Sequence, residues 1–181
     1  MRIISGIYKN RKINFKNLNI RPTTDFAKES LFNLLNNSFE LNNISVLDLC
    51  AGSGNISYEF ISRGAKNVTC VENNKKCVNF IKTIKQSLNM EQLNIISCSL
   101  QKYLSITSNV YDIIFADPPY YWKKNQYDQF INKIFAKNII NQSGMLIVEH
   151  SKFINFEDCH FFYKKKNYGR VHFTFLKYNS T

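Results

Sequence analysis

The sequence predicts an α/β fold, a doubly wound and mostly parallel sheet of seven strands that ends in an antiparallel hairpin. Five short apolar runs alternate with segments of helical periodicity that are about ten to fifteen residues long. These runs cover residues 44–50, 67–72, 93–98, 111–116 and 145–149. Two later runs, 159–163 and 171–178, flank the basic segment 164–170, a pattern typical of a hairpin with a basic tip. Alternating strands and helices favour a parallel sheet.

The helices between these strands are predicted by apolar spacing and by residues typical of helix ends. Residues 21–25, Arg-Pro-Thr-Thr-Asp, combine a proline, hydroxyl caps and an early acid, so a helix should begin there and continue to about Phe39. The other predicted helices cover 54–63, 74–88, 99–104 and 126–140. Residues 2–20 alternate weakly and carry five basic side chains, which predicts a small basic β-hairpin with its turn near residues 8–10.

Composition favours a single domain, residues 1–181, with a sizeable core, since 44% of the 181 residues are apolar. No run approaches eighteen consecutive apolar residues, and the first residues lack the long apolar region of a signal peptide, so we expect a cytoplasmic protein without membrane contact. The five cysteines form no Cys-x-x-Cys pair, and the three histidines lack metal-ligand spacing. We therefore expect neither a disulfide framework nor a metal site, and we expect a monomer.

Basic residues concentrate at the two ends of the chain. The net charge is +11, and residues 1–28 carry seven basic groups and one acid, whereas residues 152–181 carry six and two. A nearly neutral body with basic ends suits a catalytic core whose termini hold a polyanion, although a lysine-rich codon bias would explain part of the excess. The candidate RNA contacts are Arg2, Arg11, Lys12, Arg21, Thr23, Lys28, Lys165 and Arg170.

A glycine-rich turn follows the first buried run. Residues 48–55 read Asp-Leu-Cys-Ala-Gly-Ser-Gly-Asn, and such glycines let a ligand lie against the backbone. Alone this turn is weak evidence, since Ser57 stands where a dinucleotide loop has a small Gly or Ala. Glu72 strengthens the prediction because a carboxylate at the end of the second run can accept hydrogen bonds from ribose hydroxyls, although it could also be a solvated strand end.

The fourth buried run ends at Asp117-Pro118-Pro119-Tyr120. Two prolines force the chain out of a sheet, so Asp117 and Tyr120 should lie at the carboxyl edge, where open α/β sheets bind ligands. A carboxylate oxygen, a stiff carbonyl and a flat ring can together hold a planar amino group. A plain turn capped by Tyr120 is the simpler alternative.

These three strand ends together resemble the S-adenosylmethionine-dependent amino methyltransferases, whose motifs are D-x-x-x-G-x-G and N/D-P-P-Y/F/W. Further segments are similar to the bacterial small-subunit (16S) ribosomal RNA guanine-N2 methyltransferase family, in the same order over nearly the whole chain. They are residues 1–6, 21–25 and 28–32 and the pair Tyr168-Gly169. The resemblance implies a Rossmann-like fold, S-adenosylmethionine as cofactor and ribosomal RNA, in the small subunit or its assembly intermediate, as partner.

The resemblance also implies residue roles. The cofactor would be lined by Asp48, Ala51, Gly52, Ser53, Gly54, Glu72, Asn73, Ser99 and Leu100. Ser99 departs from the Asp or Asn that relatives often use for the adenine amino group. Asp117 and the Pro118 carbonyl would accept the two N–H bonds of the target amine, Pro119 would complete the catalytic corner, and Tyr120 would stack on the base.

Three alternatives remain open on the sequence. The same chemistry could act on adenine N6, or another exocyclic amine, in DNA or another RNA. A nicotinamide-dependent dehydrogenase has a similar fold but needs neither the Pro-Pro-Tyr corner nor basic ends. A non-catalytic RNA-binding protein would explain the charge but not the combination of the glycine-rich turn, Glu72 and Asp117.

Overall fold

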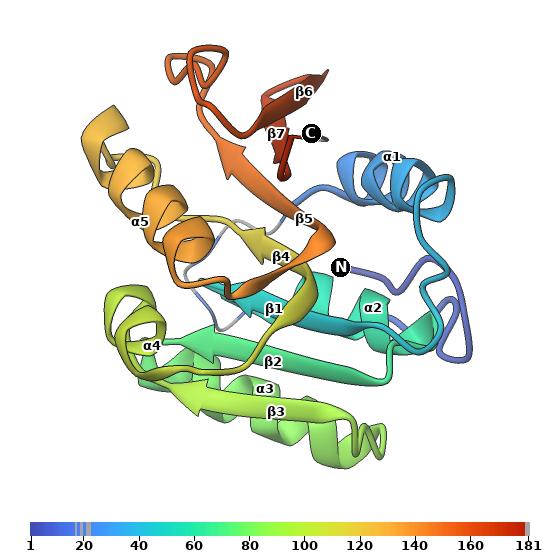
Figure 1. Cartoon of the computed structure of the whole chain (residues 1–181). Helices are drawn as coiled ribbons and strands as arrows, with labels where there is room; N and C mark the ends of the chain where they lie inside the picture. The colour runs from blue at the N-terminus through green and yellow to red at the C-terminus, as the bar shows by residue number, and fades with distance from the viewer. Residues whose placement is uncertain (17, 19, 21–22, 180–181) are drawn as a thin grey trace.

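A computed structural model describes residues 1–16, 18, 20 and 23–179 of the chain. Its strands form one seven-stranded sheet in the order β3-β2-β1-β4-β5-β7-β6, in which β3 to β5 run parallel and β7 and β6 are antiparallel (Figure 1). The strands are β1 (Ser45–Leu49), β2 (Asn67–Glu72), β3 (Leu93–Ser97), β4 (Tyr111–Ala116), β5 (Ile140–His150), β6 (Phe162–Tyr168) and β7 (Val171–Leu176). The predicted fold class is confirmed.

Helices cover both faces of this sheet (Figure 1). They are α1 (Asp25–Asn36), α2 (Asn55–Ser62), α3 (Lys75–Ser87), α4 (Leu100–Ile106) and α5 (Lys124–Ala136). Apolar residues of α1, α2 and α3 belong to one buried cluster, and those of α4 and α5 belong to a second one. Successive strand residues alternate between the two clusters, as the two-residue period of a strand requires: Ile113 and Phe115 face the first, and Ile114 faces the second.

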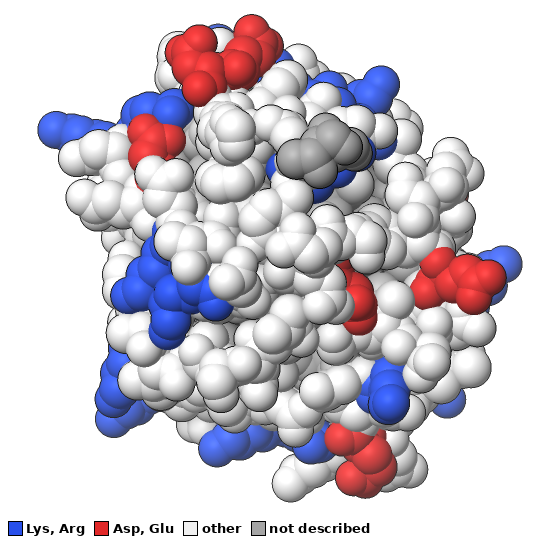
Figure 2. All heavy atoms as spheres, viewed as in Figure 1, with Lys and Arg blue, Asp and Glu red and all other residues white. Residues whose placement is uncertain are grey.

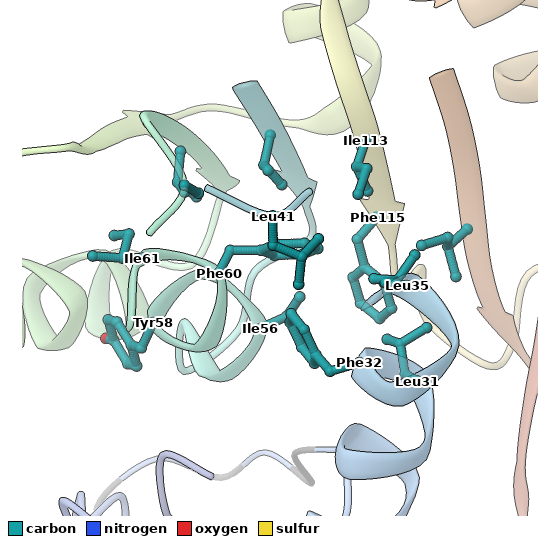
Figure 3. Packing of buried hydrophobic residues seen from close by; sticks show 14 of the residues in the cluster. Leu31, Phe32, Leu35, Leu41, Ile56, Tyr58, Phe60, Ile61, Ile113 and Phe115 are labelled. Carbon is teal, nitrogen blue, oxygen red and sulfur yellow. The ribbon is translucent and has the colours of Figure 1, made fainter. Parts of the chain in front are cut away.

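Helix α1 closes the first cluster above the centre of the sheet. Its N-cap Thr24 accepts a hydrogen bond from the Ala27 backbone N–H, as the predicted hydroxyl cap requires. Leu31, Phe32 and Leu35 point from α1 toward Phe115 of β4 and the α2 side chains (Figure 3). This packing places the start of α1 beside the carboxyl ends of β4 and β5.

The predicted boundary between the last helix and the fifth strand is wrong. Helix α5 ends at Ala136 and not at residue 140, because Asn138 adopts a left-handed φ of 51° and the Ile139 N–H bonds back to the Ile134 carbonyl at 3.0 Å. Strand β5 then begins at Ile140, five residues before the predicted start, with a register shift opposite Tyr111 and Ile113. Residues 142–144, which lie between the predicted helix and the predicted strand, belong to this irregular strand.

The hairpin tip is also shorter than predicted. Residues 164–168 belong to β6, and only Gly169 and Arg170 separate the two strands. The lysines fit a strand because their stems pack on rings: Lys164 Nζ lies 5.1 Å from the Phe175 ring centroid. The predicted strand 159–163 is therefore displaced toward the C-terminus.

The N-terminal segment turns back on itself as predicted, but its described residues form the isolated β-bridge Arg2 to Lys12 in place of a regular hairpin. Some of its backbone donors bond within the segment, as the Ile3 N–H does to the Arg11 carbonyl at 3.0 Å, and others bond to α2. The N–H groups of Ile4 and Ser5 donate to the Glu59 carboxylate at 2.8 and 3.1 Å, and the Ile7 N–H donates to the Ser62 carbonyl at 2.8 Å. The segment is thus a strap across α2.

On the face shown in Figure 2, basic and acidic side chains both lie mainly around the rim, and most of the area between them is uncharged. None of the helices in the described part of the chain combines the length and the apolar character needed to cross a bilayer.

Candidate active site

A cavity of about 540 Å³ opens at the carboxyl ends of the parallel strands. It is lined by residues that follow β1, β2, β3 and β4, by the end of β5 and by the segment before α1. This is the edge at which open α/β sheets bind ligands. The glycine-rich turn, Glu72 and the double-proline corner all line this one cavity.

The glycine-rich turn requires unusual backbone angles. Cys50, Gly52 and Gly54 have φ values of 62°, 55° and 78°, which an L side chain adopts at a cost and glycine adopts freely. Strain of this kind at Cys50, a non-glycine residue, is typical of functional sites. The turn closes through the Gly54 N–H, which donates to the Ala51 carbonyl at 2.7 Å.

Asp48 and Ser57 explain the departure from a dinucleotide loop. One Asp48 carboxylate oxygen accepts from the Ser57 backbone N–H at 3.1 Å and from its hydroxyl at 2.6 Å. Serine therefore ties the start of α2 to the end of β1, where Gly or Ala would supply only the backbone donor. Burial raises the pKa of Asp48 to about 7, against the lowering effect of the two Ser57 bonds.

Glu72 is held by two backbone donors. Its carboxylate oxygens accept from the Gly52 N–H at 2.8 Å and from the Asn74 N–H at 2.7 Å. These bonds fix the carboxylate between the glycine turn and the start of α3. A carboxylate oxygen has more than one acceptor position, so a ligand hydroxyl can still bond to the same group.

The double-proline corner is attached to β1 and closed on itself. The Asp117 N–H donates to the Leu49 carbonyl at 3.2 Å, and the Trp122 N–H donates to the Pro119 carbonyl at 2.9 Å. Burial raises the pKa of Asp117 well above its usual range, and the negative charges of Glu149 and Asp48 raise it further. A cation bound in the cavity would favour the ionised form of this carboxyl.

Tyr120 leaves the corner with about half of its surface exposed (48%), and its hydroxyl donates to Glu149 at 3.1 Å. Tyr121 beside it is 80% exposed. A flat ring at the mouth of a polar cavity offers a stacking surface for a planar ligand.

Comparison with known proteins identifies the family. The model of the family described as conserved hypothetical protein 95 matches residues 1–177. The ribosomal RNA small subunit methyltransferase D of Buchnera aphidicola subsp. Acyrthosiphon pisum is 40% identical over 152 residues, which cover 83% of this chain and 78% of the relative. The chain belongs to the ribosomal RNA small subunit methyltransferase D family.

A second family member and a solved structure agree with this assignment. The methyltransferase D of Buchnera aphidicola subsp. Baizongia pistaciae is 34% identical over 156 residues, which cover 86% of this chain and 78% of the relative. The solved "putative methylase" of Haemophilus influenzae superposes with a TM-score of 0.78 at 29% identity, covering 98% of each chain. The resemblance drawn from the motifs is thus confirmed.

Most of the cofactor contacts that the family resemblance implies line the cavity. They are Asp48, Ala51, Gly52, Ser53, Glu72, Asn73, Ser99 and Leu100. Gly54 is not among the lining residues. It is the N-cap of α2, and a Cβ added there would lie 2.6 Å from the Tyr58 ring. The Ser99 hydroxyl accepts from the Lys102 N–H at 3.2 Å and so caps α4.

The eight predicted RNA contacts divide into several groups. Thr23 and Arg170 line the cavity, and Arg11 and Lys12 are exposed. Arg2 and Lys165 pair with acids, Asp25 at 3.5 Å and Glu157 at 3.4 Å. Arg21 lies outside the described residues.

The prediction is wrong for Lys28, whose side chain is fully buried and 3.3 Å from Glu59. The helical spacing of apolar residues that predicted α1 left this face to solvent, but the N-terminal strap covers it.

Sequence reasoning missed two polar residues of the site. Asn55 donates from Nδ2 to the Thr23 carbonyl at 3.1 Å, and Glu149 accepts from the Thr23 hydroxyl at 2.8 Å. Both line the cavity. Glu149 ends the predicted fifth strand, 145–149, as Glu72 ends the second, and that shared position was a signal available in the sequence.

Proposed function

We propose that this chain transfers a methyl group from S-adenosylmethionine to 16S ribosomal RNA, and that the acceptor is the exocyclic N2 amine of a guanine. One observation carries the proposal: the cofactor-type side chains of the glycine turn and the amine-type acceptors of the double-proline corner line a single cavity. The names of the family members support ribosomal RNA as the substrate class.

The charged residues that line the cavity fit the cofactor. When bound, S-adenosylmethionine supplies a methyl group on a positively charged sulfur. Four acids line the cavity, Asp48, Glu72, Asp117 and Glu149, and Arg170 is the one lysine or arginine among the described lining residues. An acidic cavity in a strongly basic chain favours a cation inside and a polyanion outside. The fixed carboxylate of Glu72 suits a ribose diol.

The double-proline corner prepares the target amine. An amine conjugated to a purine is a poor nucleophile because its lone pair is delocalised over the ring. Asp117 and the Pro118 carbonyl are two fixed acceptors that favour a pyramidal nitrogen and so free this lone pair. Asp117 also stabilises the positive charge that develops on nitrogen, and holding amine and methyl in line supplies the proximity effect.

The base must leave its helical stack to reach this corner, at a cost of a few kcal/mol. Stacking on Tyr120 would offset part of that cost, since a base on an aromatic ring is worth about 1–3 kcal/mol. Arg170 is an exposed residue of the cavity lining, and in this proposal it contacts the phosphate backbone.

Labelled cofactor with either small ribosomal subunits or genomic DNA tests the proposal, followed by mass spectrometry of the digested nucleosides. We expect label in 16S RNA as N2-methylguanine. Label found in DNA alone, or as N6-methyladenine, would instead support the adenine alternative.

Asp117→Ala tests the role of the corner. We expect S-adenosylmethionine affinity within about threefold of wild type and turnover at least about 100-fold lower, the usual loss when one preorganised polar group is removed. Asp158→Ala is the matched control because Asp158 is exposed. Comparable turnover in the two variants would show that Asp117 does not hold the amine.

A further inference from the structure

Glu149 is a second buried acid beside the reacting corner. Only 3% of its surface is exposed, yet it lines the cavity. Ala116 of β4 pairs in register with Val148 of β5, so the next step along both parallel strands brings Asp117 beside Glu149. Neighbouring strands lie about 4.8 Å apart, and paired residues point to the same face. The two carboxylates therefore reach adjacent positions of one ligand.

The Glu149 carboxylate is held in a defined orientation. One oxygen accepts from the Thr23 hydroxyl at 2.8 Å and the other from the Tyr120 hydroxyl at 3.1 Å. The Thr23 carbonyl in turn accepts from Asn55, whose Oδ1 accepts from the buried Lys28 ammonium at 2.8 Å. The acid is thus fixed from the α1 side and linked to the aromatic ring on which a base would stack.

Guanine presents two kinds of hydrogen-bond donor side by side on one edge, the N2 amine and the neighbouring N1–H. Adenine presents its amine beside an unprotonated N1, which is an acceptor. If Asp117 holds the reacting amine, the next polar group along the sheet edge faces N1. A carboxylate there accepts from N1–H, and it repels an N1 lone pair.

We propose that Glu149 accepts the N1–H of the target guanine and thereby selects guanine over bases whose N1 is an acceptor. The inference rests on the proposed function and adds the residue that determines its base specificity. It assigns Asp117 to the amine that reacts and Glu149 to the neighbouring atom that does not. A purely structural Glu149, which only holds Tyr120 and Thr23, would have no preference for the state of N1.

The base 2,6-diaminopurine separates the two roles, since it keeps the reactive N2 amine of guanine but has an acceptor at N1. The substrates are small subunits reconstituted with 16S RNA that carries either base at the guanine mapped by mass spectrometry. The enzymes are wild type, Glu149→Gln and the control Glu40→Gln, which removes the same charge from an exposed residue. Binding of S-adenosylhomocysteine and circular dichroism report the fold of each variant.

We expect wild type and Glu40→Gln to methylate diaminopurine with a kcat/KM about 10- to 100-fold below that for guanine, as the loss of a buried charge-assisted hydrogen bond implies. In Glu149→Gln the amide can turn its NH2 toward the N1 acceptor, so the ratio should shift toward diaminopurine by at least about tenfold. Equal use of both bases by wild type, or an equal loss on both in Glu149→Gln, overturns the inference. Absence of N2-methylguanine from the wild-type reaction refutes the proposed function itself.

Inosine-substituted RNA gives a readout without catalysis, because inosine keeps N1–H and lacks the amine. Its affinity should fall about tenfold or more in Glu149→Gln and stay within about threefold in Asp117→Ala. The reverse order would show that the two acids have exchanged roles and would overturn the assignment.

Discussion

Glu59→Gln tests how strongly the N-terminal strap is held. The Glu59 side chain is fully buried and accepts from the Ile4 and Ser5 N–H groups, and it pairs with Lys28 at 3.3 Å and Arg63 at 2.9 Å. Each carboxylate oxygen serves one backbone donor and one cation. Whichever oxygen becomes an amide NH2, two donors lose their acceptor, and Lys28 stays buried without its anion.

Breaking a buried ion pair on one side costs about 3–5 kcal/mol, a large part of a typical unfolding free energy of about 5–15 kcal/mol. With a urea m-value of about 2 kcal/mol/M, the unfolding midpoint should fall by about 1.5–2.5 M. Fluorescence of Trp122, the single tryptophan and 8% exposed, reports the transition. The control Glu29→Gln, at an exposed acid of α1, should stay within about 0.5 kcal/mol of wild type.

The pH dependence of the unfolding free energy tests whether the unpaired Lys28 causes the loss of stability in Glu59→Gln. Burial lowers the pKa of Lys28 below its usual 10.5, and the charge of Glu59 opposes that lowering. Without Glu59 the folded state binds the Lys28 proton still less tightly than the unfolded state does, so the stability of the variant should rise as the pH increases toward 10.5. A loss of unfolding free energy relative to wild type of less than about 1 kcal/mol, or a loss that is the same at neutral and alkaline pH, would refute this reasoning.

Three further expectations concern the strap and the site. Gly6→Ala should destabilise the protein by clearly more than Gly169→Ala, which should cost roughly 1 kcal/mol. Both residues have positive φ, but only at Gly6 would the new Cβ collide, 1.6 Å from the Ser62 carbonyl oxygen. Equal losses of thermal stability in the two variants would contradict this. S-adenosylmethionine affinity, measured by calorimetry, should rise with pH as Asp48 ionises near 7, and Asp48→Asn should reduce that rise. A pH profile of Asp48→Asn identical to that of wild type would exclude Asp48 from cation binding. Tyr120→Ala should weaken RNA binding by about 1–3 kcal/mol in a filter assay, whereas Tyr120→Phe should change it little. A Tyr120→Ala variant that binds RNA as tightly as wild type would show that the ring does not stack on the base.

The strand ends could be predicted from the sequence because local chemistry determines them. Glycines at 52 and 54 permit the backbone angles of the turn, and two prolines end the fourth strand wherever it packs. The end of α5 was missed because Asn138, in a left-handed conformation, ends the helix before the apolar periodicity does.

The burial of Lys28 and the partners of Glu149 could not be predicted from local pattern, because both depend on distant segments. Lys28 is buried by contacts with residues 2, 55 and 59, and Glu149 is fixed by residues 23 and 120. A lysine in an amphipathic helix predicts exposure unless another segment covers it. The side chains that complete the site thus depend on the tertiary fold, whereas those of the motifs depend mainly on their neighbours.

The lysines of β6 bear on self-association. This strand is at the end of the sheet order, so its outer backbone groups could pair with a strand of another molecule. Lys164, Lys165 and Lys166 stand along that border, and charged side chains, lysine above all, oppose such strand addition. Neutralising these lysines would therefore expose a template for strand addition, and the variant should aggregate while its soluble fraction keeps the wild-type circular dichroism spectrum.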